Sequence, residues 1–237
     1  KVATVIFQNM GISFGIAFVA LIFEFLIAIP LGVKAAVNQN GVIDYTSSVL
    51  AMIGTALPTF FFAAICIQLF SVQLGWFPVN GLQGTLPNDA SAWVKFWDKI
   101  WHLVLPVFIM VFLSVGSLMR YTRTNTLDVL NADYIRTARA KGLPESKVIY
   151  KHAFRNTLIP LVTLLAGTIP GLFSGAMITE QIFSIPGIGL KAYDALKAGD
   201  IPFIMGYNMF LAILTVLGTL FADLMYAVVD PRVKLTK

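Results

Sequence analysis

Residues 133–160 have the sequence DYIRTARAKGLPESKVIYKHAFRNTLIP, a basic, helix-forming island between long apolar segments. The run YIRTARAK favours a helix that starts at Asp133. Gly142 suits the left-handed residue that follows a helix, a conformation that glycine adopts without steric cost. Pro144 and Glu145 suit the first turn of a second helix, where a missing N–H is harmless and a negative charge meets the positive end of the helix dipole. The stretch therefore predicts two short helices joined by a tight glycine turn.

The surface of this island suits the docking of a partner. Small residues leave room for the backbone of another protein, and they stand at Ala138, Ala140 and Gly142. Basic residues supply charge around them, at Arg136, Arg139 and Lys141. We therefore expect the loop over residues 120–157 to bind another protein.

The rest of the chain has the composition of a membrane protein. Hydrophobic residues make up 57% and charged residues 12% of the 237 residues, and the mean hydropathy is +0.80. A membrane span needs about 20 largely apolar residues. Five segments qualify, about 9–33, 47–70, 101–119, 158–179 and 205–229. Buried helices of a soluble protein are disfavoured, because no amphipathic shell remains to cover them. We predict an all-α, polytopic membrane helical bundle that forms a single domain over residues 1–237.

The fourth span carries the residues that weaken a helix. They are Gly167, Pro170, Gly171 and Gly175. Neighbouring helices in a membrane tolerate such residues, so we expect this span to be kinked or closely packed.

The basic residues set the orientation, because positively charged loops are retained on the cytoplasmic side. With an inward first span, 12 of the 17 basic residues fall on cytoplasmic segments. We therefore expect the N-terminus of this chain outside and its C-terminus in the cytoplasm. The net charge of +5 requires no nucleic acid, since basic inner loops meet anionic lipid headgroups. An odd number of spans and no initiator Met suggest a piece of a longer protein with a further span before residue 1.

Catalytic and metal motifs do not emerge from the sequence. There is no phosphate-binding lysine loop, GxSxG, HExxH or pair of carboxylates in a polar cleft. The one cysteine, Cys66, lies in an apolar span, which leaves no cysteine–histidine metal spacing. We expect no enzyme activity, no metal and no cofactor in this chain.

Four motifs together resemble the membrane subunits of ATP-binding-cassette importers, in their oligopeptide and dipeptide permease version. The island at 133–160 resembles the EAA loop of that family. The others are GWFPVNG at 75–81, ITEQIFSIPGIG at 178–189 and DLMYAVVDPRVK at 223–234. Arg136-Thr137-Ala138 stands where the general pattern has Glu-Ala-Ala, and Arg155 stands where many relatives have proline. Both departures fit the peptide branch, and the role of the missing glutamate is not carried over.

The resemblance implies a type I importer domain with six spans in the whole protein and a coupling helix that docks on the ATPase. The coupling residues would be Tyr134, Ile135, Arg136, Thr137, Ala138, Arg139, Ala140, Lys141, Gly142, Leu143, Pro144 and Lys147. Expected partners are two cytoplasmic ATP-binding subunits that hold ATP and Mg²⁺, a second homologous permease subunit, an extracytoplasmic substrate-binding protein, and lipid. The location would be the bacterial inner membrane. The implied function is ATP-driven oligopeptide import by alternating access. Import of dipeptides, nickel or another small solute is one alternative, and an ion-coupled secondary transporter is another.

Two segments are expected on the outer side. In the family, the strip with Trp76, Phe77 and Pro78 lies at the outer mouth, and Trp93, Trp97 and Trp101 suit an interfacial aromatic belt. The sequence SIPGIG at 184–189 predicts a turn that is rigid at its proline and flexible at the glycines that follow. We expect this turn to form a gate, with Pro186, Gly187 and Gly189 as its residues.

Charges inside spans are expensive and usually face a bundle interior or water. Glu24, within VALIFEFLIAIP, suits a translocation path and a helix-pairing role equally well. Asp223, near the inner end of the last span, is expected to pair with a basic residue or to support helix packing. Glu180, near the outer boundary, is expected to be solvated.

Overall fold

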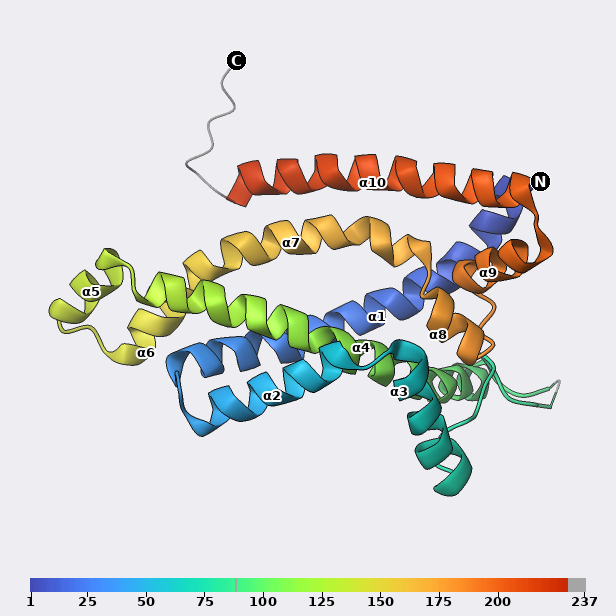
Figure 1. The fold of residues 1–237 in the computed structure, drawn as a ribbon, viewed down its shortest axis with the longest axis horizontal. Helices are drawn as coiled ribbons and strands as arrows, with labels where there is room; N and C mark the ends of the chain where they lie inside the picture. Colours follow the sequence, from blue (N-terminus) through green and yellow to red (C-terminus); the bar gives the residue numbers. More distant parts are fainter. Residues whose placement is uncertain (88, 230–237) are drawn as a thin grey trace, which may run out of the picture. The chain divides into compact units, whose positions relative to one another are not determined.

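The computed structural model describes residues 1–87 and 89–229 and shows a helical protein, with no strand among those residues (Figure 1). This confirms the all-α prediction. The elements are α1 Val2–Val37, α2 Val42–Ala56, α3 Thr59–Cys66, the π-helical η1 Ile67–Gln73, α4 Ala92–Leu130, α5 Asp133–Ala140, α6 Glu145–Lys147, the π-helical η2 Val148–Ala153, α7 Phe154–Ser174, α8 Met177–Ile182, α9 Ile188–Ala198 and α10 Ile201–Val229. The last part of the motif at 223–234, residues 230–234, and Lys237 lie outside the described residues.

Four stretches are long and apolar enough to cross a membrane, at residues 2–37, 92–130, 145–182 and 201–227. The predicted second span is not one straight helix. It is the pair α2 and α3–η1, which are separated by a break after Ala56. Pro58 explains the break, because a proline disfavours helix in the residue before it and here itself takes an extended conformation ahead of α3. Four helices, or five spans if the bent pair counts as one, agree with the predicted bundle.

Helix α4 is longer than the predicted third span of 101–119. At 1.5 Å per residue its 39 residues measure about 58 Å, against roughly 30 Å of hydrocarbon in a bilayer. The helix includes Trp93 and Trp97, which precede the predicted span, as well as Trp101 at its start. These three side chains are exposed. At its other end α4 takes in residues 120–130 of the predicted loop.

Helix α7 shows which residue interrupts the predicted fourth span. Pro170, Gly167 and Gly171 lie inside the helix, and a Cβ added at either glycine would meet nothing within 4 Å. The chain breaks instead at Gly175, which has a φ of +77°. The predicted kink is therefore a helix end, followed by the short helix α8.

The chain divides into two compact units. The first holds residues 1–23, 57–113 and 170–215, and the second holds residues 24–56, 114–169 and the described residues from 216. The first unit contains a core around Ile16, Leu105, Ile109 and Phe183. The second contains one around Ala28, Leu118, Met119 and Leu161. The single domain over residues 1–237 stays a prediction.

Small residues allow close helix packing within the second unit. A Cβ at Gly116 of α4 would lie 2.6 Å from the carbonyl oxygen of Ala51 in α2. A Cβ at Gly32 of α1 would lie 2.7 Å from the carbonyl oxygen of Met119 in α4. Such contacts are typical of membrane helices, where small residues let backbones approach.

Candidate functional site

The basic island forms a helical hairpin of α5, a turn, α6 and η2 in the second unit (Figure 1). Helix α5 begins at Asp133, as predicted, and Gly142 has a φ of +73°. The Gly142 N–H donates to the carbonyl oxygen of Arg139 at 2.9 Å, and the Leu143 N–H donates to that of Ala138 at 3.4 Å. This pair of bonds is a Schellman motif, and it satisfies carbonyls that the helix end would leave unpaired. The predicted glycine turn is confirmed.

An ion pair closes the hairpin across this turn. Arg139 Nη2 lies 2.6 Å from Glu145 Oε1, and Arg139 Nε lies 3.2 Å from Glu145 Oε2. The hydrogen bonds from the guanidinium hold the pKa of the Glu145 carboxyl below its ordinary value. Pro144 precedes the first turn of α6, one residue earlier than predicted, with extended backbone at ψ 140°.

The hairpin has a small core of its own, made by Ile135, Ala138, Val148 and Ala153. The sequence interpreted the small side chain at Ala138 as room for a partner's backbone. The structure gives a different reason, because Ala138 is buried against η2 within this chain. Of the predicted coupling residues, Ile135 and Ala138 therefore face inward, and Leu143 is partly buried.

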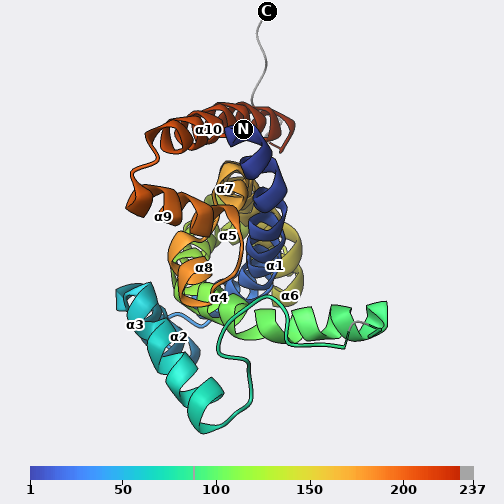
Figure 2. The same cartoon turned by 90° about the vertical axis from the view of Figure 1, so that its right-hand side faces the viewer.

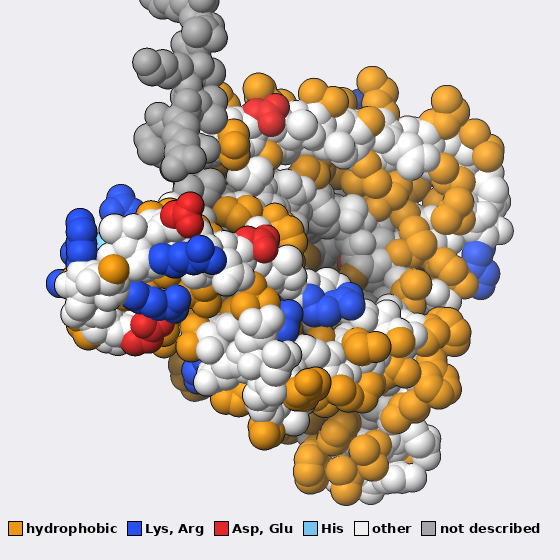
Figure 3. Space-filling model, turned by 60° about the vertical axis from the view of Figure 1, so that its left-hand side comes forward, with side chains coloured by type: hydrophobic (Ala, Val, Ile, Leu, Met, Phe, Trp, Pro, Cys, Tyr) orange, Lys and Arg blue, Asp and Glu red, His pale blue; other side chains and the backbone are white. Residues whose placement is uncertain are grey.

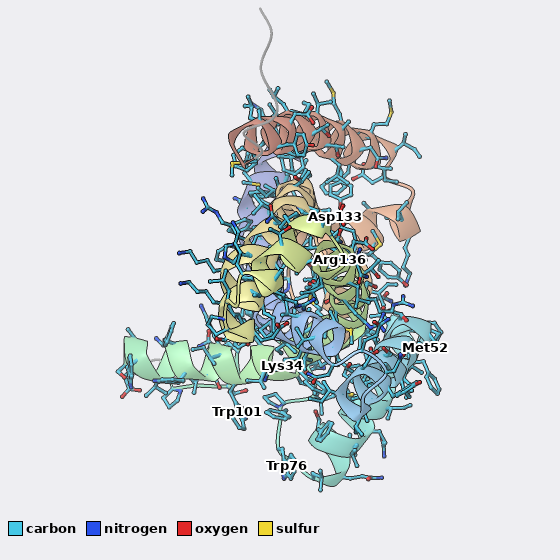
Figure 4. The ribbon with its side chains drawn as sticks, turned by 90° about the vertical axis from the view of Figure 1, so that its left-hand side faces the viewer. Lys34, Met52, Trp76, Trp101, Asp133 and Arg136 are labelled. Carbon is cyan, nitrogen blue, oxygen red and sulfur yellow. The ribbon has the colours of Figure 1, made fainter. Side chains whose placement is uncertain are left out.

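The remaining predicted coupling residues are exposed, and we name this set of residues the coupling face. They are Tyr134, Arg136, Thr137, Arg139, Ala140, Lys141, Gly142, Pro144 and Lys147. Basic side chains gather at this end of the unit (Figure 3). Asp133 and Arg136 lie on the same helix (Figure 4), with Arg136 Nη1 3.7 Å from Asp133 Oδ1. The Tyr134 side chain adds an aromatic ring that is 47% exposed.

A buried ion pair in the same unit was not predicted. Asp44 of α2 is 4% exposed, and its two carboxylate oxygens accept hydrogen bonds from Nε and Nη2 of Arg123 in α4. The Asn40 N–H also donates to Asp44, at 2.9 Å. Asp44 and Arg123 therefore tie α2 to α4. An acid in the first turn before an apolar run was the available signal, but its partner lies 79 residues away.

The two segments predicted on the outer side meet in the first unit. Gly75 and Gly81 have left-handed φ values of +63° and +89°. The Gly81 N–H donates to the carbonyl oxygen of Phe183 at 2.7 Å. Phe77 packs against the core that contains Phe183, and its ring centroid lies 5.0 Å from that of Trp101. The strip at 75–81 and the turn at 183–189 are therefore one assembly.

The exposed members of this assembly are Gly75, Trp76, Val79, Asn80, Ser184 and Pro186. Trp76 is 55% exposed, and Pro186 is also exposed. Pro78 is partly buried, and its carbonyl oxygen accepts a hydrogen bond from Ser71 Oγ at 3.3 Å. Trp76 and Pro186 are the predicted gate residues that a partner or cargo could reach.

The glycines of the turn serve close packing, whereas the sequence suggested flexibility. Gly187 and Gly189 are buried. A Cβ at Gly187 would lie 2.5 Å from Ser13 Oγ, and one at Gly189 would lie 2.8 Å from Cα of Met177. Any larger residue at either position would displace a neighbouring element.

Glu180 is the largest error of the sequence interpretation. The side chain was expected in solvent, but Glu180 is 2% exposed. Its carboxylate accepts hydrogen bonds from Ser13 Oγ at 2.6 Å, from the Ala176 N–H at 3.1 Å and from the Leu190 N–H at 2.9 Å. Figure 2 shows α8 and α9 beside the N-terminal part of α1, where Ser13 lies. The signal in the sequence was an acid flanked by glycines before and after it.

The two predicted intramembrane charges differ in their surroundings. Glu24 of α1 is partly buried and hydrogen-bonds the side chain of Ser114 in α4. This contact favours helix pairing over the translocation path. Asp223 of α10 is exposed and forms no ion pair with a basic residue in the described ranges.

Among the residues that the structure describes, no group of three or more His, Cys, Asp or Glu side chains could hold a metal ion. The Cys66 side chain is buried in an apolar core.

The fold and the hairpin define a polytopic membrane subunit of a transporter. Residues 28–235 match the family described as "Binding-protein-dependent transport system inner membrane component", and the chain belongs to that family. It is 44% identical over 216 residues to the oligopeptide transport system permease protein AppB of Bacillus subtilis, with 91% of this chain and 67% of the relative covered. It is 37% identical to the dipeptide transport system permease protein DppB of Escherichia coli, with 91% and 68% covered.

Solved structures show the same fold. The inward-facing MetNI methionine ABC transporter has a TM-score of 0.73 at 18% identity, with 96% of this chain and 97% of that chain covered. An amino acid ABC transporter with histidines has a TM-score of 0.60 at 13% identity, with 98% and 95% covered. The chain is therefore a channel-forming subunit of a binding-protein-dependent ABC importer. It lies in the inner membrane and works with ATPase and substrate-binding partners.

Proposed function

We propose that this subunit imports oligopeptides, with the energy supplied by ATP hydrolysis in its partners. The observation that carries the cargo assignment is the 44% identity to a permease protein of an oligopeptide transport system. Dipeptide import is the second candidate, because relatives of dipeptide systems are 35–37% identical. Nickel is a weaker alternative, since the described residues offer no cluster of metal-binding side chains.

The proposed complex has two cytoplasmic ATP-binding subunits, a second homologous permease subunit and an extracytoplasmic binding protein. Lipid surrounds it, and no nucleic acid takes part. ATP and Mg²⁺ bind to the ATPase subunits, and this chain holds no cofactor. The stoichiometry follows from the resemblance to type I importers.

The coupling face would deliver the energy. Its basic side chains, among them Arg136, Lys141 and Lys147, suit an acidic surface on the ATPase, and exposed Tyr134 suits an apolar pocket there. The core of Ile135, Ala138, Val148 and Ala153 makes the hairpin stiff enough to transmit a displacement. ATP binding would move the hairpin and bias the membrane helices between inward and outward openings.

The same basic side chains support an orientation with the hairpin in the cytoplasm. The N-terminus of this chain would then lie outside and its C-terminus inside. The strip at 75–81 and the turn at 183–189 would lie at the outer mouth, with Trp76 and Pro186 accessible to the binding protein.

The test is purification of the full-length tagged protein in mild detergent, mass spectrometry of what stays bound, and uptake in liposomes. Recovery of ATPase subunits and a second polytopic subunit, with ATP-dependent uptake of labelled tetrapeptide, is the expected result. Preference for a labelled dipeptide or for ⁶³Ni²⁺ would move the assignment to that cargo. Recovery of this chain alone, with uptake driven by an ion gradient without ATP, would overturn the importer function.

A further inference from the structure

The carboxyl group of Glu180 is buried, and the proposed coupling does not use it. Three hydrogen bonds hold it, and they come from three different places in the chain. Ser13 Oγ belongs to α1, the Ala176 N–H precedes α8, and the Leu190 N–H lies in the first turn of α9. A buried carboxylate is tolerated only where such donors replace water. One side chain therefore joins three segments.

Ser13 completes this arrangement from the side of α1. Its hydroxyl donates to Glu180 Oε1 at 2.6 Å and accepts from the Ile188 N–H at 2.9 Å. The residue before α9 is Gly187, which has no side chain that could cap the helix. The free N–H groups of Ile188 and Leu190 are thus capped by two residues distant in sequence. A negative charge at this helix start also meets the positive end of the helix dipole.

Three glycines close around the same carboxylate. A Cβ at Gly175 would lie 3.0 Å from Glu180 Oε1, and one at Gly189 would lie 2.9 Å from Glu180 Oε2. A Cβ at Gly187 would collide with the carboxylate itself. The backbone at these glycines therefore lies directly against the Glu180 carboxyl group and leaves no room for a side chain.

We propose that Glu180 and Ser13 form a latch that holds the 183–189 turn onto α1, so that α8, α9 and the N-terminal part of α1 move as one piece during transport. Both are positioning residues, because neither needs to touch cargo. The turn itself carries exposed Pro186 and bonds to the strip at 75–81 through Phe183. The latch depends on the proposed function in one respect, which is that the 183–189 turn acts as a gate of the importer.

Two variants separate the latch from a general packing role. Glu180→Gln keeps the shape of the side chain but replaces one accepting oxygen by an amide nitrogen, which leaves a buried N–H unpaired. Ser13→Ala removes the bridging hydroxyl alone. Asp194→Asn is the matched control, because Asp194 is an exposed carboxylate on α9. We expect roughly tenfold slower ATP-dependent uptake for each latch variant, no further loss in the double variant, and no change for the control.

A distance measurement in the assembled complex gives a readout that does not depend on cargo. Spin labels at Gln8 of α1 and Gln181 of α8, both exposed, report on the latch in a Cys66→Ala background. We expect one narrow distance distribution that is the same with and without ATP and vanadate. It should broaden in Ser13→Ala and in Glu180→Gln, and should not change in Asp194→Asn.

A Gln8–Gln181 distance that changes with nucleotide in the unmodified latch would overturn the proposal, even if both latch variants failed to assemble. So would additive losses of uptake in the double variant. A complex that keeps the narrow distance but takes up no peptide would refute the proposed cargo and leave the latch standing.

Discussion

Gly142 allows backbone conformation to be tested apart from steric contact. Its φ of +73° lies in the left-handed region, yet a Cβ added there would meet nothing within 4 Å. Within the hairpin, the effect of a substitution should therefore come from backbone strain. For alanine this strain is about 1–2 kcal/mol, which shifts the balance between the formed and the opened turn by a factor of roughly 5–30. Asparagine adopts this conformation more readily, and β-branched valine tolerates it least.

The expected order of coupling is therefore glycine, asparagine, alanine and then valine. Each variant would be assembled with its partners in liposomes, and peptide taken up per ATP hydrolysed would be compared. Gly142→Val should insert normally and hydrolyse ATP but transport little. In parallel, hydrogen exchange at the Leu143 N–H, which closes the turn onto Ala138, should quicken in the same order.

Normal coupling in Gly142→Val would show that the Schellman turn does not carry the force. An asparagine variant as defective as valine would also contradict the argument, because the two differ mainly in their tolerance of a positive φ. A loss of membrane insertion in all three variants, with alanine included, would place the requirement for glycine in biogenesis.

Three further predictions concern helix packing and the hairpin. Asp44→Asn should lower the stability of the detergent-solubilised complex by about 3 kcal/mol at most, the low end for a broken buried ion pair, since Arg123 is 25% exposed. A thermal melt measures this, and an unchanged midpoint would mean that the pair contributes nothing. Gly116→Ala should lower the same midpoint, because its Cβ would lie 2.6 Å from a backbone oxygen of α2, whereas Gly11→Ala, with nothing within 4 Å, should not. Glu145 has a lowered pKa, so its ion pair stabilises the hairpin above the ordinary glutamate pKa of 4.5 and is lost as the pH falls below it. Hydrogen exchange of the hairpin, corrected for intrinsic rates, should show this dependence, and Glu145→Gln should abolish it.

Local features were predictable from the sequence, because they depend on residues close together in the chain. Asp133 starts α5, and Gly142 adopts a positive φ, both as predicted. The apolar segments were also found, because length and hydropathy need no knowledge of contacts. Pro58 was visible too, but only the structure shows that the helix breaks there, between α2 and α3.

Tertiary partners were not predictable in the same way. Glu180 is held by a hydroxyl 167 positions away, and the glycines on either side of it in the sequence do not identify that partner. Ala138 shows a second difficulty. A small residue is compatible with a docking surface and with a tight core, and the sequence does not say which side of the helix faces the protein. The spacing of hydrophobic residues also does not identify the buried face of helices such as α10, because these helices are apolar on every side.

In the α5–η2 hairpin, one set of residues keeps the hairpin folded and a different set forms its exposed surface. Ile135 and Ala138 maintain its shape from within, while Tyr134, Arg136 and Thr137 point outward. Exchange of these outward residues should therefore leave the fold of the hairpin unchanged. If the coupling face docks on the ATPase as proposed, grafting these surface residues should be enough for an importer of this kind to accept the ATPase subunits of a different system.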